Sequence, residues 1–270
     1  MVAESGGRMM DAAHQITGED HIMPSLDGRV AIITGSARNI GRATARALAA
    51  EGASLVIHAR KDKEGVDEAV ALLASEGATA IGHLADVSTE AGAQSLVDAA
   101  VARFGRVDIL VNNAAIRRNT PLVEMSFAEW REVLANSLDC AFLCTRYAAP
   151  HMIKGGWGRI VNIGGISMFK GTPGRTHVSA AKAGMIGMAR SLASELGPHG
   201  ITVNVVAPGA IDTVRSGAAG VRPASTAAAS NPVGRDGRPE EIAHIVTMLC
   251  RPDAAYTTGQ TIEVNGGAHY

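Results

Sequence analysis

The stretch "RVAIITGSARNIG", residues 29–41, decides the fold of this chain. Its first half is a short β-branched run that ends in glycine, and its second half opens a helical pattern that continues to about Glu51. Short, continuously apolar runs of this kind are typical of strands buried on both faces. The stretch therefore predicts a strand, a tight turn and a helix, the first unit of an alternating α/β fold.

The same alternation continues to the end of the chain. Residues 25–270 are expected to form one doubly wound α/β domain, in which helices cover both faces of a parallel sheet. Further strands are predicted within 54–59, 79–84, 108–112, 159–163, 202–207 and 260–264. Helices are predicted near 63–76, 90–104, 127–152, 177–196 and 240–250.

Two segments stand outside this pattern. Residues 1–24 are mixed and polar and have no apolar centre of a signal peptide, so we expect a flexible tail. Residues 212–236 are rich in Ala, Ser, Gly and Pro and follow a strand's carboxyl end, where open α/β sheets bind ligands. They predict a lid, although a disordered surface insertion would have the same composition.

Composition excludes several classes of function. The formal net charge is -1, so no basic field predicts a nucleic-acid partner. No apolar run reaches the roughly 18 to 20 residues that cross a bilayer, so we expect no membrane span. Cys140 and Cys144, one helical turn apart, could form a metal or redox pair, but free cysteines usually act as small buried hydrophobes. We therefore expect no metal site and a cytoplasmic location.

The turn after the first strand has the features of a phosphate site. Gly35 and Gly41 frame it, and the amino terminus of the following helix offers free N–H groups to a pyrophosphate. A third glycine is expected where Asn39 stands. Asn is the next best residue for left-handed backbone angles, so we expect the turn to be preserved.

Seven motifs in order extend this interpretation. They are "TGSARNIG" (34–41), "NNAA" (112–115), Asn136, Lys182, "APGAIDT" (207–213), "NPVGR" (231–235) and "GQTIEVNGG" (259–267). Together they resemble the short-chain dehydrogenase/reductase family, and within it the 3-oxoacyl-acyl-carrier-protein reductases. The resemblance implies a Rossmann-type fold with seven parallel strands, a nicotinamide cofactor, a small-molecule substrate and a homotetramer.

The residues at the end of the second strand indicate which nicotinamide cofactor binds. NAD-binding relatives place an acid there for the ribose 2′-hydroxyl. This chain has Ala59, followed by Arg60 and Lys61, and Arg38 lies in the glycine turn. Guanidinium groups suit a 2′-phosphate, so we expect NADP rather than NAD, unless these cations are ordinary solvated loop charges.

The resemblance also implies a set of cofactor-binding residues. Asp86 and Val87 would flank the adenine, Asn113 would line the cofactor path, and Ile211 and Thr213 would contact the nicotinamide end. The full set is Gly35, Ser36, Arg38, Asn39, Ile40, Gly41, Arg60, Asp86, Val87, Asn113, Ala114, Lys182, Pro208, Gly209, Ile211 and Thr213.

The catalytic positions match only in part. In this family a tyrosine four residues before the lysine and a serine near the fifth strand both contact the substrate oxygen. Aligned without a gap, Lys182 and Asn136 are kept, but Val178 stands at the tyrosine position and Gly165 at the serine position. His177 points about 100° away from Val178 on a helix, and could replace the acid only if the helix began late. The candidate catalytic residues are thus Asn136, Lys182 and His177.

Three functions remain open at this stage. An atypical NADP-dependent oxidoreductase would suit a substrate that accepts hydride before it is protonated, such as an iminium ion or a conjugated enone. A cofactor-binding subunit or sensor without turnover is the alternative that Val178 and Gly165 favour. Non-redox lyase or isomerase chemistry on the same fold is the third.

Overall fold

The computed structural model describes residues 25–214 and 231–270. The strands are β1 (Val30–Ile33), β2 (Ser54–Ala59), β3 (Ala80–Leu84), β4 (Ile109–Asn112), β5 (Gly158–Ile163), β6 (Ile201–Pro208) and β7 (Thr261–Val264). The helices are α1 (Asn39–Ala50), α2 (Lys63–Ser75), α3 (Glu90–Phe104), α4 (Phe127–Leu134), α5 (Cys140–Gly155), α6 (Ser167–Lys170), α7 (Thr176–Leu196) and α8 (Pro239–Cys250). Within the described residues the predicted single α/β domain is confirmed.

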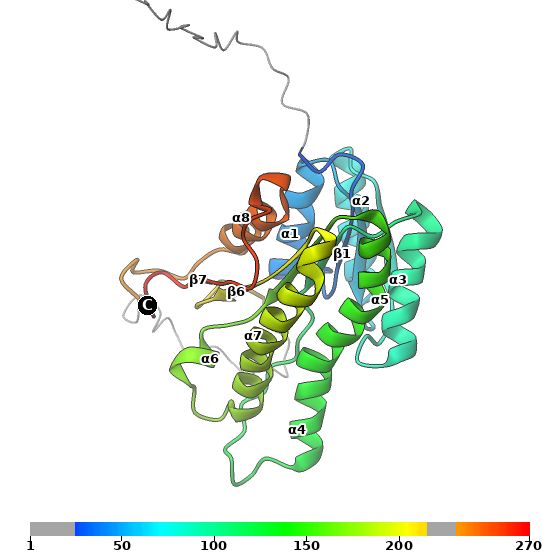
Figure 1. Ribbon diagram of the computed structural model, residues 1–270. Coiled ribbons are helices and arrows are strands. Elements are labelled where there is room, and N and C mark those ends of the chain that lie inside the picture. The colour runs from blue at the N-terminus through cyan, green and yellow to red at the C-terminus, as the bar shows by residue number, and fades with distance from the viewer. Residues whose placement is uncertain (1–24, 215–230) are drawn as a thin grey trace, which may run out of the picture.

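The seven strands form one parallel sheet in the order β3-β2-β1-β4-β5-β6-β7. Helices α1, α2 and α8 cover one face, and α3, α5 and α7 cover the other (Figure 1). The strand order reverses between β1 and β4, so the loops after these two strands diverge at the carboxyl edge. That edge is where a ligand crevice is expected.

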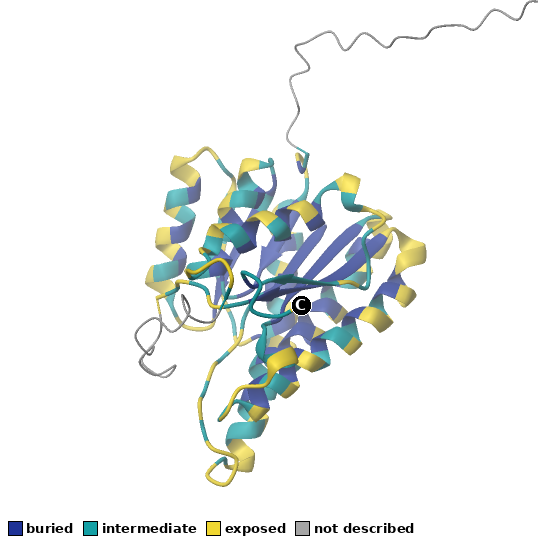
Figure 2. Ribbon diagram, turned by 90° about the vertical axis from the view of Figure 1, so that its left-hand side faces the viewer, coloured by how far each residue is buried: buried dark blue, intermediate teal, exposed yellow. Residues whose placement is uncertain are grey.

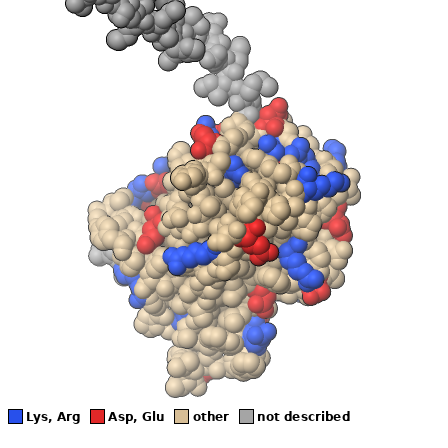
Figure 3. Space-filling view, viewed as in Figure 1, with Lys and Arg blue, Asp and Glu red and all other residues tan. Residues whose placement is uncertain are grey.

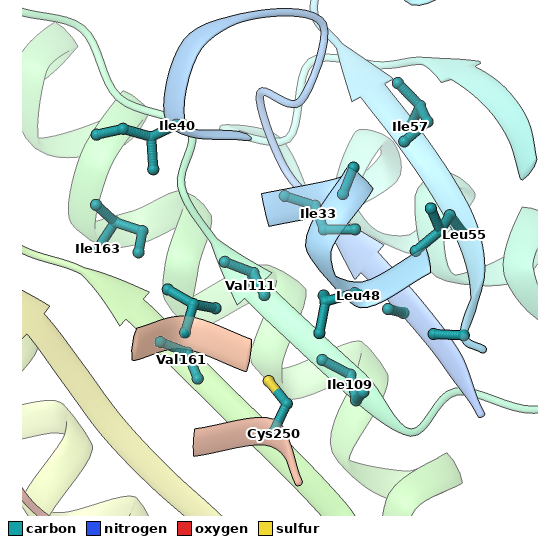
Figure 4. Close-up of a cluster of buried hydrophobic side chains, with 14 of the residues drawn as sticks. Ile33, Ile40, Leu48, Leu55, Ile57, Ile109, Val111, Val161, Ile163 and Cys250 are labelled. Carbon is teal, nitrogen blue, oxygen red and sulfur yellow. The ribbon is translucent and has the colours of Figure 1, made fainter. Parts of the chain in front are cut away.

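The core explains why the apolar runs form strands. Every residue of β1 and β4 is buried, and Figure 2 shows the sheet in dark blue between helices whose outer sides are yellow. On the α1 side, Ile33 and Val111 of the sheet belong to one buried cluster with Leu48 and Cys250 (Figure 4). β-Branched side chains pack well on a pleated surface covered from both sides.

Several boundaries differ from the prediction. The helix expected over 127–152 consists of α4, a π-helical turn at Ala135–Asp139 and α5, which continues to Gly155. Helix α6 was not predicted, since four residues are too few to show a periodicity. Helix α7 begins at Thr176, one residue before His177.

Only the two ends of the expected lid are described. Ile211 and Gly237 form an isolated parallel bridge, and Asp212 donates its N–H to Gly237 O at 2.8 Å. This bridge closes the base of the segment. Residues 215–230 and the expected tail, 1–24, lie outside the described residues.

Charges on the visible face are mixed. Blue and red side chains alternate over the face in Figure 3, and no continuous blue stripe crosses it. In the described part of the chain, no helix combines the length and apolarity needed to cross a bilayer.

Candidate functional site

The turn between β1 and α1 has the backbone that a phosphate cradle requires. Gly35 has a φ of +65°, and Asn39 has a φ of +53°, so Asn39 adopts the left-handed conformation expected of it. A Cβ built on Gly41 would lie 2.5 Å from Gly35 O. Glycine at 41 therefore lets α1 start directly against the turn, with its first N–H groups at the carboxyl edge.

Two side chains hold the turn in place. The Nδ2 of Asn113 donates to the carbonyls of Thr34 and Gly35, both at 2.9 Å. His58, buried at the end of β2, accepts the Gly35 N–H at Nδ1 (3.1 Å), and its Nε2 lies 3.0 Å from Ala85 O. Because Nδ1 accepts, the ring proton belongs on Nε2 and the ring is neutral. Burial lowers the pKa of His58 to about 4, which agrees with this assignment.

Two adjoining cavities of about 420 and 320 Å³ open at this turn. The larger one, called here the catalytic-side cavity, extends past the β4 loop to Thr213 and Val214. The smaller one, the adenine-side cavity, extends past the end of β2 to Asp86 and Val87. The predicted site residues that line one or both are Gly35, Arg38, Asn39, Ile40, Gly41, Arg60, Asp86, Val87, Asn113, Ala114, Asn136 and Thr213.

The other predicted cofactor residues do not line these cavities. Ser36 is fully buried, where its Oγ donates to Ile33 O at 2.7 Å and accepts from His58 N at 2.9 Å. Its side chain therefore supports the turn from below. Pro208, Gly209 and Ile211 lie at the β6 end, where a Cβ on Gly209 would meet Asn265 Cα at 2.7 Å.

The two arginines at the adenine-side cavity have different partners. Arg38 pairs with Asp62 at 2.6 Å, and the other oxygen of Asp62 accepts from Gly65 N at 3.1 Å, capping α2. Both oxygens of this nearby acid are thus engaged. Arg60 reaches across to the other side of the cavity and donates to Asn136 Oδ1 at 3.1 Å.

Lys182 lies under the carboxyl end of β5. Its amine is buried and donates to Ile163 O at 2.5 Å. Burial first, and then the positive charge of Arg117, lower its pKa to about 8. One turn earlier on α7, Val178 is buried, while a Cβ on Gly165 would meet nothing within 4 Å. The space that a serine would need at 165 is therefore open.

Asn136 lies in the π-helical turn between α4 and α5. Its Nδ2 donates to Glu132 O at 2.9 Å, which leaves Oδ1 for Arg60. π-Helical turns inside α-helices are frequent at functional sites.

His177 is not brought to either cavity. It is fully buried on α7, and its Nε2 lies 3.2 Å from Oε1 of Glu129 on α4. The late helix start that would turn it inward does not occur, because α7 begins at Thr176. The geometry places His177 between two helices, on a side of α7 different from that of Lys182.

The cysteines show no sign of metal chemistry in the described residues. All three are free and buried, and burial raises the pKa of Cys140 and Cys250 to about 12. No group of three or more His, Cys, Asp or Glu side chains that could hold a metal occurs in that part of the chain.

Two residues of the site were missed from the sequence. Arg117 lines the catalytic-side cavity, and His58 supports the glycine turn. The signals were present: a charged pair directly after β4 in "NNAAIRRN", and one polar residue within the apolar run "SLVIHA".

Comparison with protein families gives one match over most of the chain. The model described as "Enoyl-(Acyl carrier protein) reductase" matches residues 35–269. Similar curated proteins are reductases as well. The 3-oxoacyl-[acyl-carrier-protein] reductase of Synechocystis sp. is 40% identical over 91% of this chain and 98% of its own length. The short-chain reductase protein NovJ of Streptomyces niveus is 40% identical over 88% and 93%.

A solved structure agrees with the fold. A double mutant of a Serratia marcescens short-chain dehydrogenase/reductase superposes with a TM-score of 0.83 at 31% identity. The match covers 90% of this chain and 99% of the other.

Proposed function

Because the chain belongs to the short-chain dehydrogenase/reductase family, we propose that it is an NADP-dependent oxidoreductase whose active site works without the usual tyrosine and serine. The observation that carries the proposal is the intact cofactor cradle. Gly35, Asn39 and Asn113 build the turn, and the two cavities extend from it along the carboxyl edge.

The cradle fits a dinucleotide on its own geometry. A Cβ on Gly35 would lie 3.1 Å from Ala114 Cα and one on Gly41 would lie 2.5 Å from Gly35 O, so glycine alone lets the backbone approach a pyrophosphate closely. Bound at this edge, NADPH would supply a hydride to a carbon atom of the substrate.

The preference for NADP rests on the end of β2. Ala59 offers no carboxylate, and the nearby Asp62 is engaged in capping α2 and in pairing with Arg38. Arg38 and Arg60 both line the adenine-side cavity, so two guanidinium groups face the place where a ribose 2′-phosphate would lie.

The proton has to come from a group other than a tyrosine. Lys182 is the ionisable side chain one turn after Val178, and its pKa of about 8 leaves it largely protonated at neutral pH. We assign this role to Lys182 and give His177, paired with Glu129, none. A substrate that accepts hydride before protonation, such as an iminium ion or a conjugated enone, needs the least help from the missing groups.

One observation favours the alternative, a cofactor-binding subunit without turnover. The Lys182 amine donates to a main-chain carbonyl and lies in the wall of neither cavity. Rapid mixing with imines and enones separates the two functions: NADPH that binds but is not oxidised by any of them supports the silent subunit.

Cofactor choice is tested by fluorescence titration of NADPH and NADH. We expect NADPH to bind about tenfold or more tightly, and Arg60→Ala to remove most of that difference, because a charge-assisted pair is worth about 1.5–3 kcal/mol. Arg103→Ala, which removes an exposed arginine on α3, is the control and should leave the difference in affinity between NADPH and NADH unchanged. Equal affinities in the wild type would disprove the NADP preference.

A further inference from the structure

The residues after β7 pack against two other segments at the carboxyl edge of the sheet. Asn265 directly follows β7, and a Cβ on Gly209, just after β6, would lie 2.7 Å from the Cα of Asn265. Gly266 O accepts the N–H of Val233 at 3.2 Å, from the loop that precedes α8. The end of the chain is therefore joined to the β6 end and to the loop before α8.

His269 adds a third connection, to the short helix α6. Its ring stacks on the ring of Phe169, with the centroids 5.0 Å apart and the ring planes 9° from parallel. Nδ1 of His269 lies 2.9 Å from Oε2 and 3.1 Å from Oε1 of Glu263, on β7. The Nδ2 of Asn265 donates to Glu263 Oε2 at 2.8 Å and to His269 O at 3.1 Å. The ring that stacks on Phe169 is thus fixed to β7.

Helix α6 needs such contacts because it is short. It belongs to the segment that follows Gly165, the position of the missing serine, and Met168 N donates to Gly165 O at 3.1 Å. Four residues are too few for a helix to be stable through its own hydrogen bonds, so the place of α6 depends on packing against the rest of the protein. The stack of His269 on Phe169 is one of the contacts that supply this packing.

We propose that His269 is a positioning residue for the catalytic end, which consists of positions 165 and 178 and Lys182: it holds α6 against β7 and so fixes the place of residue 165. The proposal rests on the proposed function in treating position 165 as part of the catalytic end. It gives His269 no contact with substrate or cofactor. Stacked rings add a modest attraction beyond the area they bury, so loss of the ring should release α6 without unfolding the domain.

Limited trypsin digestion of the full-length protein tests whether His269 holds α6. The bonds Lys170–Gly171, at the end of α6, and Lys154–Gly155, in the last turn of α5, join the same two residue types, and both lysines are exposed. Cleavage at Lys154–Gly155 is therefore an internal control for the stability of the whole domain. In His269→Ala we expect Lys170–Gly171 to be cut about two- to tenfold faster, and Lys154–Gly155 to be cut at an unchanged rate.

Three variants separate the ring of His269 from its charged partner. His269→Phe keeps a ring that can stack and removes the bond to Glu263, so it should restore part of the protection at Lys170. Glu263→Gln keeps the His269 ring and removes the negative charge beside it, and should release α6 less than His269→Ala does. His199→Ala, which removes an exposed histidine before β6, is the control and should match the wild type.

A thiol at position 165 reports on the catalytic end directly. A Cβ there would meet no other atom within 4 Å, so Gly165→Cys should be accepted, and the three native cysteines are buried. Labelling by a maleimide should be about two- to tenfold faster in Gly165→Cys combined with His269→Ala than in Gly165→Cys alone, because release of α6 exposes this position.

Three results would overturn the proposal. The first is cleavage of His269→Ala at Lys170–Gly171 at the wild-type rate. The second is a rise of equal size at Lys154–Gly155, which would show general destabilisation, and the third is an unchanged labelling rate at position 165. None of these measurements needs cofactor or turnover. A protein that fails to bind NADPH or to transfer hydride can still have α6 held by His269, so the two proposals fail separately.

Discussion

Val178 and Gly165 leave the catalytic end without a phenol and a hydroxyl, and a Cβ at position 165 would meet no other atom within 4 Å. A side chain at 165 meets open space, and residue 178 is on the helix face that also carries Lys182. The catalytic end therefore differs from the family pattern in the side chains at positions 165 and 178, and not in the backbone that carries them.

Restoring those side chains should create ordinary ketone reduction. We expect Gly165→Ser with Val178→Tyr to raise NADPH-dependent reduction of simple ketones by about 10²–10⁴, the usual contribution of a positioned general acid. Val178→Tyr alone should recover part of this gain, and Gly165→Ser alone little, because the phenol transfers the proton. Steady-state NADPH oxidation measures the rate of ketone reduction. A wild type already as active as the double variant would refute the idea that the missing phenol and hydroxyl limit this rate.

His58 should make stability depend on pH. Its folded pKa of about 4 is below the ordinary 6.5, so the unfolded chain binds more protons between these values. Its contribution is complete above pH 6.5 and is lost as the pH falls towards 4. Between pH 7 and pH 5 it should decrease the free energy of unfolding by about 2 kcal/mol.

Urea denaturation at the two pH values checks this expectation. In His58→Gln, which keeps an acceptor but cannot titrate, the decrease from pH 7 to pH 5 should be smaller by about the same amount. His199→Gln, which replaces an exposed histidine, should behave like the wild type. If the free energy of unfolding of His58→Gln fell by as much between pH 7 and pH 5 as that of the wild type, the His58 ring would not be held neutral in the folded protein.

At the scale of elements, α1 begins at a residue that performs two tasks. Asn39 adopts left-handed backbone angles, and its amide also exchanges two hydrogen bonds with the main chain of Val214, at 2.9 and 3.0 Å. The start of α1 is thereby connected to the end of the described segment before residue 215.

Two substitutions separate these tasks. Asn39→Gly keeps the backbone angles and removes the side-chain bonds, whereas Asn39→Ala removes the bonds and also adds a Cβ that disfavours the left-handed region. We expect the alanine variant to be less stable than the glycine variant by about 1–2 kcal/mol. Thermal or urea unfolding measures the difference, and equal stabilities would mean that the turn relaxes to another conformation.

The strands were predictable to within a residue or two, because β-branched runs such as "SLVIHA" show their burial directly in composition. The π-helical turn at 135–139 was not, since one wider turn barely changes the apolar spacing of a long helix. The glycine turn follows from local angles and was also predictable. The bond between Arg60 and Asn136 joins residues 76 positions apart, so no local pattern contains it.

At the scale of the whole molecule, the surface carries apolar side chains that water does not favour. Phe127 and Phe142, on α4 and α5, are 77% and 50% exposed. Leu122 and Val123, just before α4, are exposed as well. A surface of this kind suits association between copies of the chain, in line with the homotetramer that the sequence motifs predict.

We therefore expect a homotetramer. Light scattering at micromolar concentration should give about four times the 27.8 kDa mass of one chain. Phe142→Glu should shift this towards dimers or monomers, because a carboxylate would be buried without a partner. Leu84→Glu, on the edge strand β3, is the control and should leave the mass unchanged. A monomeric wild type would contradict the prediction.

The hydrogen bond from Arg60 to Asn136 has a consequence for the kinetics of cofactor binding. Arg60 lies in the wall of both cavities, so a dinucleotide that spans them has to displace the Arg60 side chain. Breaking the bond costs every such ligand about 0.5–1.5 kcal/mol, but only one that carries a 2′-phosphate gives the guanidinium a new anionic partner. Selection would then act on dissociation: NADH and NADPH would enter equally often, and NADH, which lacks the 2′-phosphate, would leave sooner.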